Sequence, residues 1–532
     1  MKVDCSNIAY EETGLFSTLV RDYISAKGTA RSYVQYEPIY AGIEAAIAAR
    51  KQCKSHRKEL VEVLAHQYQN LQKEQAVLDN IDLLLKDNTF VITTAHQPNL
   101  FTGPLYFFYK IIHAIQLAAD LQQRYPNYHF VPVYYIGSED ADIEEVGSFV
   151  LDGQKYQWET QQTGAIGRMK VDDALLKLLQ NFTGYWAVKP EGKNALAIIQ
   201  DAYQKGRTIS EATLQMVHGF FGQYGLVVLE PDNAALKSLF IPTIEKELLE
   251  QFSNKAIQPA VTTLREQYHV QTEGRALNLF YLKDQLRARI EKDGEDYVIA
   301  DTNLRFSKDQ ILEELHAHPE RFSPNVILRG VFQETVLPGI VFIGGGGELA
   351  YWMELKEVFS QAGIHYPLLQ LRNSFACMTA KTKQQWDSLG FSFNDLFKPV
   401  LDLEVAYVKK HATDQLNMDK AIATHRALYA QIEAQVLTID ATLRDHAKNL
   451  AHQSEKKLLE LEKKMIRAER RKQSVAIDRI HSIKNELFPN NGLQERVENI
   501  AEWISVYGWD WVESVMQHSN TMEQNFTIIV YP

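Results

Sequence analysis

The sequence predicts an α/β protein in which helices cover a parallel sheet and a long helical coiled coil follows near the C-terminal end. Two observations lead to this fold class. Patterns typical of a strand, a polar turn, a helix and a second strand follow one another between residues 90 and 136. Such a βαβ unit places parallel strands beneath a helix. The second observation is that neither glycine nor proline occurs from Leu401 to Phe488, which indicates helices longer than those of an ordinary compact domain.

Composition narrows the class of protein. The chain has 532 residues, with 56 Lys and Arg against 67 Asp and Glu, and a formal net charge of −11. This acidic balance argues against a nucleic-acid partner. No window approaches the roughly 18 apolar residues of a membrane span, and the N-terminus has no apolar stretch of signal-peptide length. The three cysteines are widely separated, so we expect a cytoplasmic protein without a disulfide framework or a metal site built from cysteines.

The first half of the chain supplies the start of the core. Residues 1–88 are expected to be helical and to pack on the core, because apolar residues recur at spacings of three and four after Pro38. Residues 89–150 form the first half of the core. Within them we expect a buried strand, a helix and a second strand at residues 90–94, 105–124 and 130–136.

The middle of the chain, residues 151–330, is expected to continue the core with inserted segments. Leu226 to Leu229 is typical of a buried strand, and Ala234 to Phe252 of helix apart from Pro242. Short alternating runs between Tyr268 and Thr302 indicate a small antiparallel insertion. The second half of the core, residues 331–384, follows. In and just before it, strands are expected at residues 326–332, 340–343 and 366–371.

Residues 385–490 are predicted to form the coiled coil. Apolar positions and one histidine follow a spacing of four and three at Ile432, Val436, Ile439, Leu443, His446 and Leu450. Thr438 and Asp440 are good helix N-caps, so a break is expected near 438–441. A helix over 441–487 would be about 70 Å long at 1.5 Å per residue. It must therefore pair with the preceding helix, with a second chain, or with both. Residues 491–532 are expected to return to the core.

Polar side chains follow the ends of several predicted strands. They are His96, Gln97 and Asn99 after the first strand, Glu139, Asp140 and Asp142 after the second, and Gln333, Glu334, Arg372 and Asn373 at later ones. Ligands of open α/β sheets bind outside the carboxyl ends of the strands, so we expect these segments to meet around one cleft. The acidic run at 139–145 suits an amine or an amino sugar, a Mg²⁺ ion, or simply the first turn of a helix.

A run of four glycines at 344–347 precedes a predicted helix. Glycines allow a ligand to approach the backbone closely, and unpaired amides there suit phosphate or carboxylate. Glu348, Tyr351 and Trp352 are three to four residues apart, so they are expected to converge on one ligand from one face of the helix. The sequence contains neither a Walker loop nor a GxGxxG motif, and no signature of a nucleophilic hydrolase.

Taken together, these motifs resemble the BshC family over essentially the whole chain. The motifs are TAHQPNLFTGPLYFFYK, VPVYYIGSEDADIEEV, QETVLPGIVFIGGGGELAYWMELKEVF, LLQLRNSF and LFPNNGLQERV. The resemblance implies a Rossmann-like core related to nucleotidyltransferases, inserted connecting-peptide segments, and a coiled coil that forms a homodimer. It also implies a carbon-nitrogen ligase that joins L-cysteine to the amine of glucosaminyl-malate, the last step of bacillithiol biosynthesis.

For a ligase of this kind, we assign roles to the candidate residues as a hypothesis from the chemistry of amide formation. Glu139 or Asp140 would hold the amino sugar and accept its proton. His96, Gln97 and the glycine amides would bind the anionic donor, Tyr351 and Trp352 would form the pocket wall, and Arg372 and Asn373 would bind the malate carboxylates. Further substrate contacts would come from Asn99, Asp142, Gln333, Glu334 and Glu348. Nucleotide contacts would come from Gly344, Gly345, Gly347, Asn490, Gln494 and Arg496.

The sequence leaves several alternatives open. It leaves open whether ATP activates the carboxylate, with ADP or AMP as its product, and whether Mg²⁺ binds among the carboxylates. A nucleotidyltransferase-like enzyme that couples another carboxylic acid to an amine is one alternative function. A non-catalytic, nucleotide-binding dimeric scaffold is another, but it predicts the loss of polar residues at the strand ends. In this sequence those residues are dense, which favours the ligase.

Overall fold

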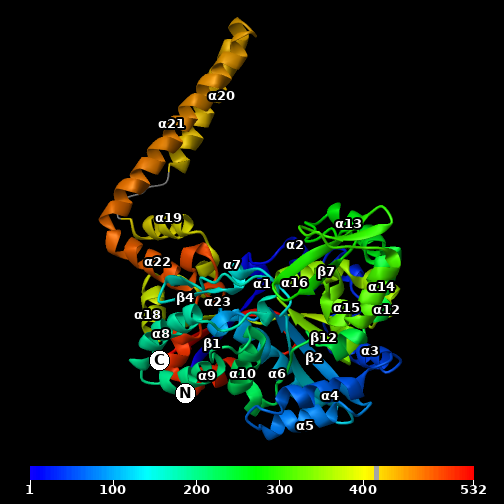
Figure 1. The fold of residues 1–532 in the computed structure, drawn as a ribbon. Coiled ribbons are helices and arrows are strands. Elements are labelled where there is room, and N and C mark those ends of the chain that lie inside the picture. The colour runs from blue at the N-terminus through cyan, green and yellow to red at the C-terminus, as the bar shows by residue number, and fades with distance from the viewer. Residues whose placement is uncertain (413–417) are drawn as a thin grey trace. The chain divides into compact units, whose positions relative to one another are not determined.

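The computed structural model describes residues 1–412 and 418–532, and they divide into two compact units (Figure 1). The first unit comprises residues 1–376 and 494–529, and the second comprises the described part of 377–493 together with 530–532. The first unit contains the α/β core. The second contains the long helices.

A five-stranded parallel sheet forms the centre of the first unit, with the strand order β13-β12-β2-β3-β6. The strands are β2 (Thr89–His96), β3 (His129–Ile136), β6 (Val227–Leu229), β12 (Gly339–Gly344) and β13 (Leu368–Leu371). The chain runs from β2 through β3 to β6, and later places β12 and β13 on the other side of β2. The strand order therefore reverses beside β2, which is where such sheets open a crevice for ligands. The predicted parallel core is confirmed.

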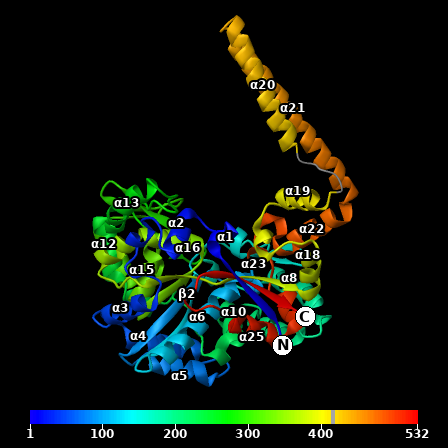
Figure 2. The ribbon, with the colours of Figure 1, turned by 180° about the vertical axis from the view of Figure 1, so that it is seen from behind.

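One face of the sheet is covered by α3 (Tyr40–Arg50) and α6 (Tyr106–Arg124). Side chains alternate between the faces of a strand, and Phe90 and Ile92 of β2 share a hydrophobic core with these two helices. Figure 2 shows α6 beside β2. Because α6 begins shortly after the carboxyl end of β2, its first turns lie at the edge of the sheet where the polar residues gather.

Trp352 lies in the core on the other face of the sheet. It belongs to α16 (Gly346–Glu354), is 2% exposed, and stacks on Phe342 of β12 with ring centroids 4.1 Å apart and an interplanar angle of 18°. Its ring also contacts Phe359 of α17 (Lys356–Ala362). The prediction that Trp352 forms a pocket wall is therefore wrong, since its large apolar surface is buried between the helices and the sheet.

Residues 326–332 form a helix and not the predicted strand. They begin α15 (Val326–Val336), which Asn325 caps by accepting a hydrogen bond from the Ile327 N–H at 2.9 Å. Most of this helix is buried, so its sequence is apolar without a clear polar face. A short apolar run of this kind does not distinguish a buried helix from a buried strand. Gln333 and Glu334 consequently lie inside a helix and not at a strand end.

The N-terminal segment is helical only in part. The first residues form strand β1 (Asp4–Ala9), in a sheet of order β1-β15-β14 with β15 (Asn525–Tyr531) and β14 (Ser374–Thr379). Thr527 donates a hydrogen bond to the Asn7 side chain at 3.0 Å, from 520 residues away along the chain. A partner so distant leaves no local pattern, which is why the prediction of an entirely helical 1–88 is wrong here. Further helices are α1 (Tyr10–Thr13), α2 (Thr18–Ser25), α4 (Arg57–Tyr68) and α5 (Gln75–Leu83).

The predicted antiparallel insertion is confirmed as a five-stranded sheet of order β10-β9-β8-β7-β11. Its strands are β7 (Leu279–Lys283), β8 (Leu286–Asp293), β9 (Asp296–Ile299), β10 (Arg305–Phe306) and β11 (Phe322–Pro324). The short hairpin β4 (Ser148–Leu151) and β5 (Gln154–Gln157) is a separate sheet. Other helices of this unit include α8 (Asp173–Ala187), α9 (Gly192–Ala202), α10 (Ile209–Phe221), α11 (Ala234–Ser238), α12 (Ile241–Glu250), α13 (Phe252–Arg265), α14 (Lys308–Ala317), α23 (Gln494–Val497), α24 (Ala501–Tyr507) and α25 (Trp509–Gln517).

The second unit contains an antiparallel helical hairpin of α20 (Asp419–Ile439) and α21 (Leu443–Lys472). Ion pairs from Arg426 to Glu455 and from Arg444 to Glu433 show that the two helices run in opposite directions. The predicted break near 438–441 is confirmed, because residues 440–442 form the turn. The predicted single helix over 441–487 is interrupted at Gln473, after which α22 (Ser474–Leu487) begins.

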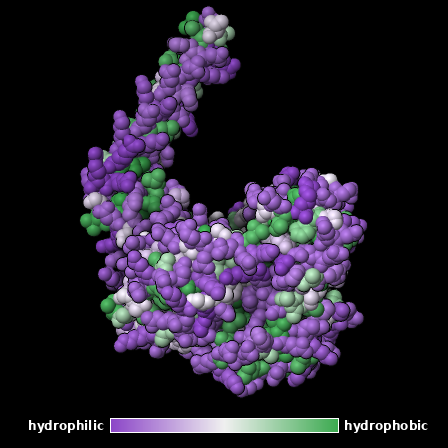
Figure 3. Space-filling model, in the orientation of Figure 1, coloured by the Kyte–Doolittle hydropathy of each residue, from purple (hydrophilic) through white to green (hydrophobic). Residues whose placement is uncertain are grey.

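Apolar side chains are exposed along this hairpin. Leu428, Ile439 and Leu450 are 52%, 73% and 44% exposed, and Figure 3 shows hydrophobic residues in green among hydrophilic ones on these helices. The unit also contains α18 (Ala380–Ser388) and α19 (Val400–His411). The long helix therefore pairs with the preceding helix, as one of the predicted alternatives requires.

Replacing Trp352 by alanine is expected to lower the free energy of unfolding by about 3–5 kcal/mol, because it removes a large buried ring and leaves a cavity. Urea denaturation measures this loss. Val188→Ala is the control, since Val188 is 80% exposed and its change should stay within about 0.5 kcal/mol. A Trp352→Ala protein as stable as the wild type would contradict the core position.

Candidate functional site

A cleft of about 540 Å³ lies in the first unit at the carboxyl ends of β2, β3 and β12. His96, Glu139, Glu348 and Arg372 all line it, although they come from four distant parts of the sequence. The expected meeting of these segments around one cleft is therefore observed. Other lining residues are Gln97, Tyr106, Lys110, Tyr135, Ser138, Asp140, Glu145, Phe280, Arg287, Asn325, Arg329, Gly345, Gly346, Gly347, Tyr351 and Arg496.

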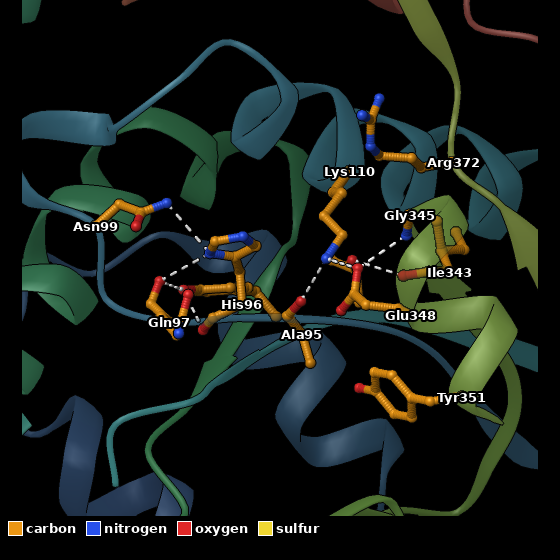
Figure 4. Close-up of polar contacts among 12 residues, drawn as sticks. Ala95, His96, Gln97, Asn99, Lys110, Ile343, Gly345, Glu348, Tyr351 and Arg372 are labelled. Carbon is orange, nitrogen blue, oxygen red and sulfur yellow. Dashed lines mark hydrogen bonds and ion pairs between the residues drawn. The ribbon is translucent and has the colours of Figure 1, made fainter. Parts of the chain in front are cut away.

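A buried lysine connects three elements at this cleft. Lys110 of α6 is 2% exposed; its Nζ donates to the Ala95 carbonyl of β2 at 2.7 Å and forms an ion pair with Glu348 of α16 (Figure 4). Burial lowers the pKa of Lys110. Burial acts to raise the pKa of Glu348, but Lys110, His96 and the Gly345 N–H outweigh it and lower that pKa. The charge of Glu348 thus opposes the effect of burial on Lys110, and the charge of Lys110 opposes the effect of burial on Glu348.

The glycines of the turn at residues 344–347 differ in their surroundings: some are packed tightly against neighbouring side chains, and some line the cleft. A Cβ at Gly344 would lie 2.8 Å from Leu349 Cδ1, and one at Gly346 would lie 2.5 Å from the Phe16 ring. A side chain at either position would therefore force these neighbours to move, so packing favours glycine at both. A Cβ at Gly347 would have no atom within 4 Å. Gly345, Gly346 and Gly347 line the cleft at the start of α16, where helix amides without intrahelical partners favour an anion.

His96 lines the cleft as a neutral ring. Its imidazole packs against Tyr106 and Phe107 with centroid distances of 5.3 Å and 5.9 Å. Asn99 Nδ2 lies 3.2 Å from His96 Nδ1 (Figure 4). Burial, together with the positive charge of Lys110, lowers the pKa of His96 to about 3. At neutral pH this side chain acts through hydrogen bonds and not through charge.

Glu139 belongs to a buried ionic network on the other side of the cleft. It pairs with Lys237 of α11, which is 1% exposed and also lies 2.9 Å from Asp232. Arg168 donates two hydrogen bonds to Asp232 at 2.6 Å and 2.8 Å. Burial raises the pKa of Glu139 against the lowering effect of Lys237. Its carboxylate is therefore a stronger base than that of an ordinary glutamate.

Asp140, the neighbour of Glu139, is a stable carboxylate. It accepts hydrogen bonds from Gln97 Nε2 at 2.6 Å and from the Ala141 N–H at 2.8 Å. Burial acts to raise its pKa, but these bonds and the charges of Arg287 and Arg329 outweigh it, so the pKa is lowered. Glu139 and Asp140 thus have different proton affinities, a difference typical of acid and base pairs in active sites.

Family models and curated relatives match this chain over nearly its whole length. Residues 1–373 match the model described as "Bacillithiol biosynthesis BshC, N-terminal Rossmann-like domain", and residues 375–531 match the C-terminal coiled-coil domain of the same family. The chain belongs to the BshC family.

Relatives named "Putative cysteine ligase BshC" include one from Flavobacterium johnsoniae, 37% identical over 99% of this chain and 100% of the relative. Another, from Christiangramia forsetii, is 35% identical over 100% and 99% of the two chains. A third, from Bacillus cytotoxicus, is 26% identical over 94% and 96%. The chain is accordingly a ligase of bacillithiol biosynthesis.

Arg372 forms an ion pair with Glu495 of the same chain. Its two terminal nitrogens lie 3.0 Å and 2.6 Å from the carboxylate oxygens of Glu495, and the two side chains are 2% and 0% exposed. The adjacent Asn373 does not line the cleft, since its Nδ2 donates to the Asn520 carbonyl at 2.9 Å and its Oδ1 accepts from Ser519 at 2.5 Å. In this BshC chain Glu495 therefore offsets the charge of Arg372, which lines the cleft, so a contact of Arg372 with a malate carboxylate stays a prediction. The prediction for Asn373 is wrong, because this side chain lies outside the cleft.

Several other predicted residues lie outside the cleft. Asn99 is buried behind His96, Gln333 and Glu334 are buried inside α15, and Asp142 is exposed and caps α7 (Ile143–Val146). Of the predicted nucleotide contacts, Gly345, Gly347 and Arg496 line the cleft. Gly344 and Gln494 are part of the first unit but do not line it, and Asn490 belongs to the second unit.

The structure adds residues that the sequence analysis did not include. They are Tyr106 and Lys110 of α6, Arg287 of β8 and Arg329 of α15, which line the cleft, and Lys237 of α11, which pairs with the lining residue Glu139. A lysine inside an otherwise apolar helical run indicates a buried charge, so the burial of Lys110 could have been predicted from the sequence. Arg329 lies in the helix mistaken for a strand, and nothing in the local pattern distinguishes Arg287 or Lys237.

Within residues 1–412 and 418–532, no group of three or more His, Cys, Asp and Glu side chains is placed to hold a metal ion. Over the same residues, none of the helices combines the length and the apolar character needed to cross a membrane.

Replacing Lys110 by methionine is expected to lower the free energy of unfolding by about 3 kcal/mol at pH 8, because Glu348, whose side chain is 23% exposed, is left as a partly buried charge without its cationic partner. In this variant the pKa of Glu348 should rise above its value in the unfolded chain. A raised pKa gives stability that is present at low pH and lost as pH rises. The deficit against the wild type should therefore be larger at pH 8 than at pH 5, as measured by urea denaturation at both.

The double variant Lys110→Met with Glu348→Gln is the matched control, because it removes both charges. It should recover more than half of the lost stability at pH 8 and show no extra pH dependence between pH 5 and pH 8. Equal deficits at the two pH values in the single variant would mean that Glu348 does not depend on Lys110.

Proposed function

We propose that this chain joins the carboxyl group of L-cysteine to the amine of glucosaminyl-malate by an amide bond and so forms bacillithiol. The names of the relatives support cysteine as the donor, and the family description supports the pathway. One structural observation carries the proposal: a basic carboxylate at Glu139 and the amides of the glycine turn line the same cleft. An amine to be deprotonated and an anionic donor need these two kinds of group.

The chemistry requires an activated donor. A free carboxylate does not form an amide with an amine in water, so the proposal includes ATP as the co-substrate. A cysteine carboxylate oxygen attacks ATP and takes either its terminal phosphoryl group, which releases ADP, or its adenylyl group, which releases pyrophosphate. The amine nitrogen then attacks the carboxyl carbon, and the C–N bond forms. The C–O bond to the activating group breaks, and phosphate or AMP leaves with the electron pair. The proton released by the attacking nitrogen passes to a base.

Glu139 is suited to be that base. Its raised pKa favours proton uptake, and its pairing with buried Lys237 fixes the position of the carboxylate. Asp140 stays ionised and is held by Gln97, so it is suited to bind the substrate ammonium group before proton transfer. General base catalysis of this kind contributes about 10²–10⁴-fold to the rate.

The donor would bind near the glycine turn. The start of α16 supplies amides, Arg496 supplies a positive charge, and neutral His96 supplies a ring N–H or an acceptor. These groups are fixed by packing before a ligand arrives, and preorganised donors are effective in stabilising developing negative charge. ATP and Mg²⁺ binding in this region belong to the proposal.

A homodimer through the coiled coil is also part of the proposal. The exposed apolar residues on α20 and α21 support it, because such residues along a pair of helices favour association with a further helix. Light scattering of the purified chain tests this part separately from the chemistry.

The decisive assay combines purified protein with glucosaminyl-malate, L-cysteine and ATP. Mass spectrometry should detect bacillithiol, and nucleotide analysis should detect either ADP or AMP. Glu139→Gln should lower kcat by at least about 100-fold, because the base is removed. A melting curve should accompany each variant, since Lys237 loses one partner.

Glu144→Gln is the control for this experiment, because Glu144 is exposed on the neighbouring α7 and does not line the cleft. It should keep the wild-type kcat. Product formed only with a different carboxylic acid would favour the alternative transferase. No amide product with any amino acid, from a folded protein, would reject the proposed function.

A further inference from the structure

The charges that line the cleft do not all have partners. Five cationic and four acidic side chains line it. Lys110 pairs with Glu348 and Arg372 pairs with Glu495 within the protein, and the charge of Glu139 is offset by Lys237, which does not line the cleft. Three arginines, Arg287, Arg329 and Arg496, then remain with two carboxylates, Asp140 and Glu145. The cleft is therefore prepared for an anionic ligand.

Arg287 has a free hydrogen-bonding position. It lies on β8 of the antiparallel insertion, and its guanidinium stacks over the Phe280 ring at 3.7 Å from the centroid. Its Nε is buried and, among the described residues, has no hydrogen-bond partner. A buried donor without a partner is costly and is normally satisfied by a ligand or by water. The stacked ring fixes the plane of the guanidinium, which suits a carboxylate bound by two parallel hydrogen bonds.

Arg329 comes from a different element, α15, and points into the same cleft. One of its terminal nitrogens donates to the Tyr351 hydroxyl at 3.0 Å. Burial acts to lower its pKa, but Tyr351, Glu348 and Asp140 outweigh it, so the arginine stays charged. Within residues 1–412 and 418–532, no carboxylate oxygen lies within 4 Å of the guanidinium nitrogens of Arg287 or Arg329. In this they differ from Arg372, which forms an ion pair with Glu495.

The two arginines lie on the acidic side of the cleft. The charge of Asp140 acts on both, and Glu139 also acts on Arg287. If Glu139 and Asp140 hold the amine of the acceptor, an anion held by Arg287 belongs to the same molecule. We propose that Arg287 and Arg329 bind the two carboxylates of the malate part of the acceptor, in the place that sequence analysis gave to Arg372. This assignment rests on the proposed function.

The chemistry of the acceptor agrees with two arginines from two elements. A malate group carries two carboxylates on adjacent carbons, and each guanidinium can engage one of them. An ATP phosphate is the competing anion, but the helix N-terminus at the glycine turn and Arg496 already provide for it. The antiparallel insertion would then determine acceptor specificity, while the parallel sheet carries the reacting groups.

Binding measured without turnover tests the inference. Isothermal titration calorimetry of the full chain with glucosaminyl-malate, with L-malate, with glucosamine and with ADP separates the ligands. Arg287→Gln and Arg329→Gln should each weaken glucosaminyl-malate and L-malate by about 10–100-fold, because each loses a charge-assisted hydrogen-bond pair. Glucosamine and ADP should bind as they do to the wild type. Arg287→Lys should lose most of the affinity, because an ammonium group does not provide two parallel bonds.

Arg289→Gln is the matched control, because Arg289 lies on the same strand but does not line the cleft. It should bind glucosaminyl-malate normally. Unchanged glucosaminyl-malate affinity in both folded arginine variants, or a loss that falls on ADP instead, would overturn the inference. The two proposals can also be separated. If the wild-type protein forms no amide product, but binds glucosaminyl-malate and the arginine variants do not, the proposed function fails while the carboxylate site stands.

Discussion

The ion pair between Lys110 and Glu348 is the interaction on which the cleft depends. A buried lysine or glutamate alone is strongly destabilising, but each makes the other tolerable. Because Lys110 also donates to the Ala95 carbonyl, the pair joins the end of β2, the first turns of α6 and the start of α16. Those three elements define the floor of the cleft. Their relative positions are thus set by electrostatics as well as by apolar packing.

The cleft separates charges that serve the scaffold from charges that face a ligand. Arg372 is bound by Glu495, so its role is to hold the end of β13 against the C-terminal segment of the first unit. Glu139 occupies an intermediate position, because Lys237 fixes it while burial keeps its pKa raised. A site built this way reorganises little during a reaction, since most of its polar groups already have partners.

The sequence was most informative where the signal is local. Alternating and continuous apolar runs located β2, β3, β12 and β13, and the absence of glycine and proline located the long helices. It failed where the deciding partner is distant or where burial removes periodicity. Helix α15 has no polar face to mark its period, and Arg372 meets a glutamate 123 residues away. Trp352 has the right spacing from Glu348 but packs on Phe342. The positions of strand ends were predictable, but the pairing of each charge was not.

The single unconfined glycine of the turn, Gly347, has a practical consequence. Its neighbours at 344 and 346 are fixed by Leu349 and Phe16, whereas a methyl group at 347 meets no atom within 4 Å. Its φ is not positive, so an L-residue adopts the same backbone there. Progressively larger side chains at position 347 would narrow the cleft in steps without disturbing the first turn of α16. A cysteine there would offer a chemical handle for a fluorescent label that reports occupancy.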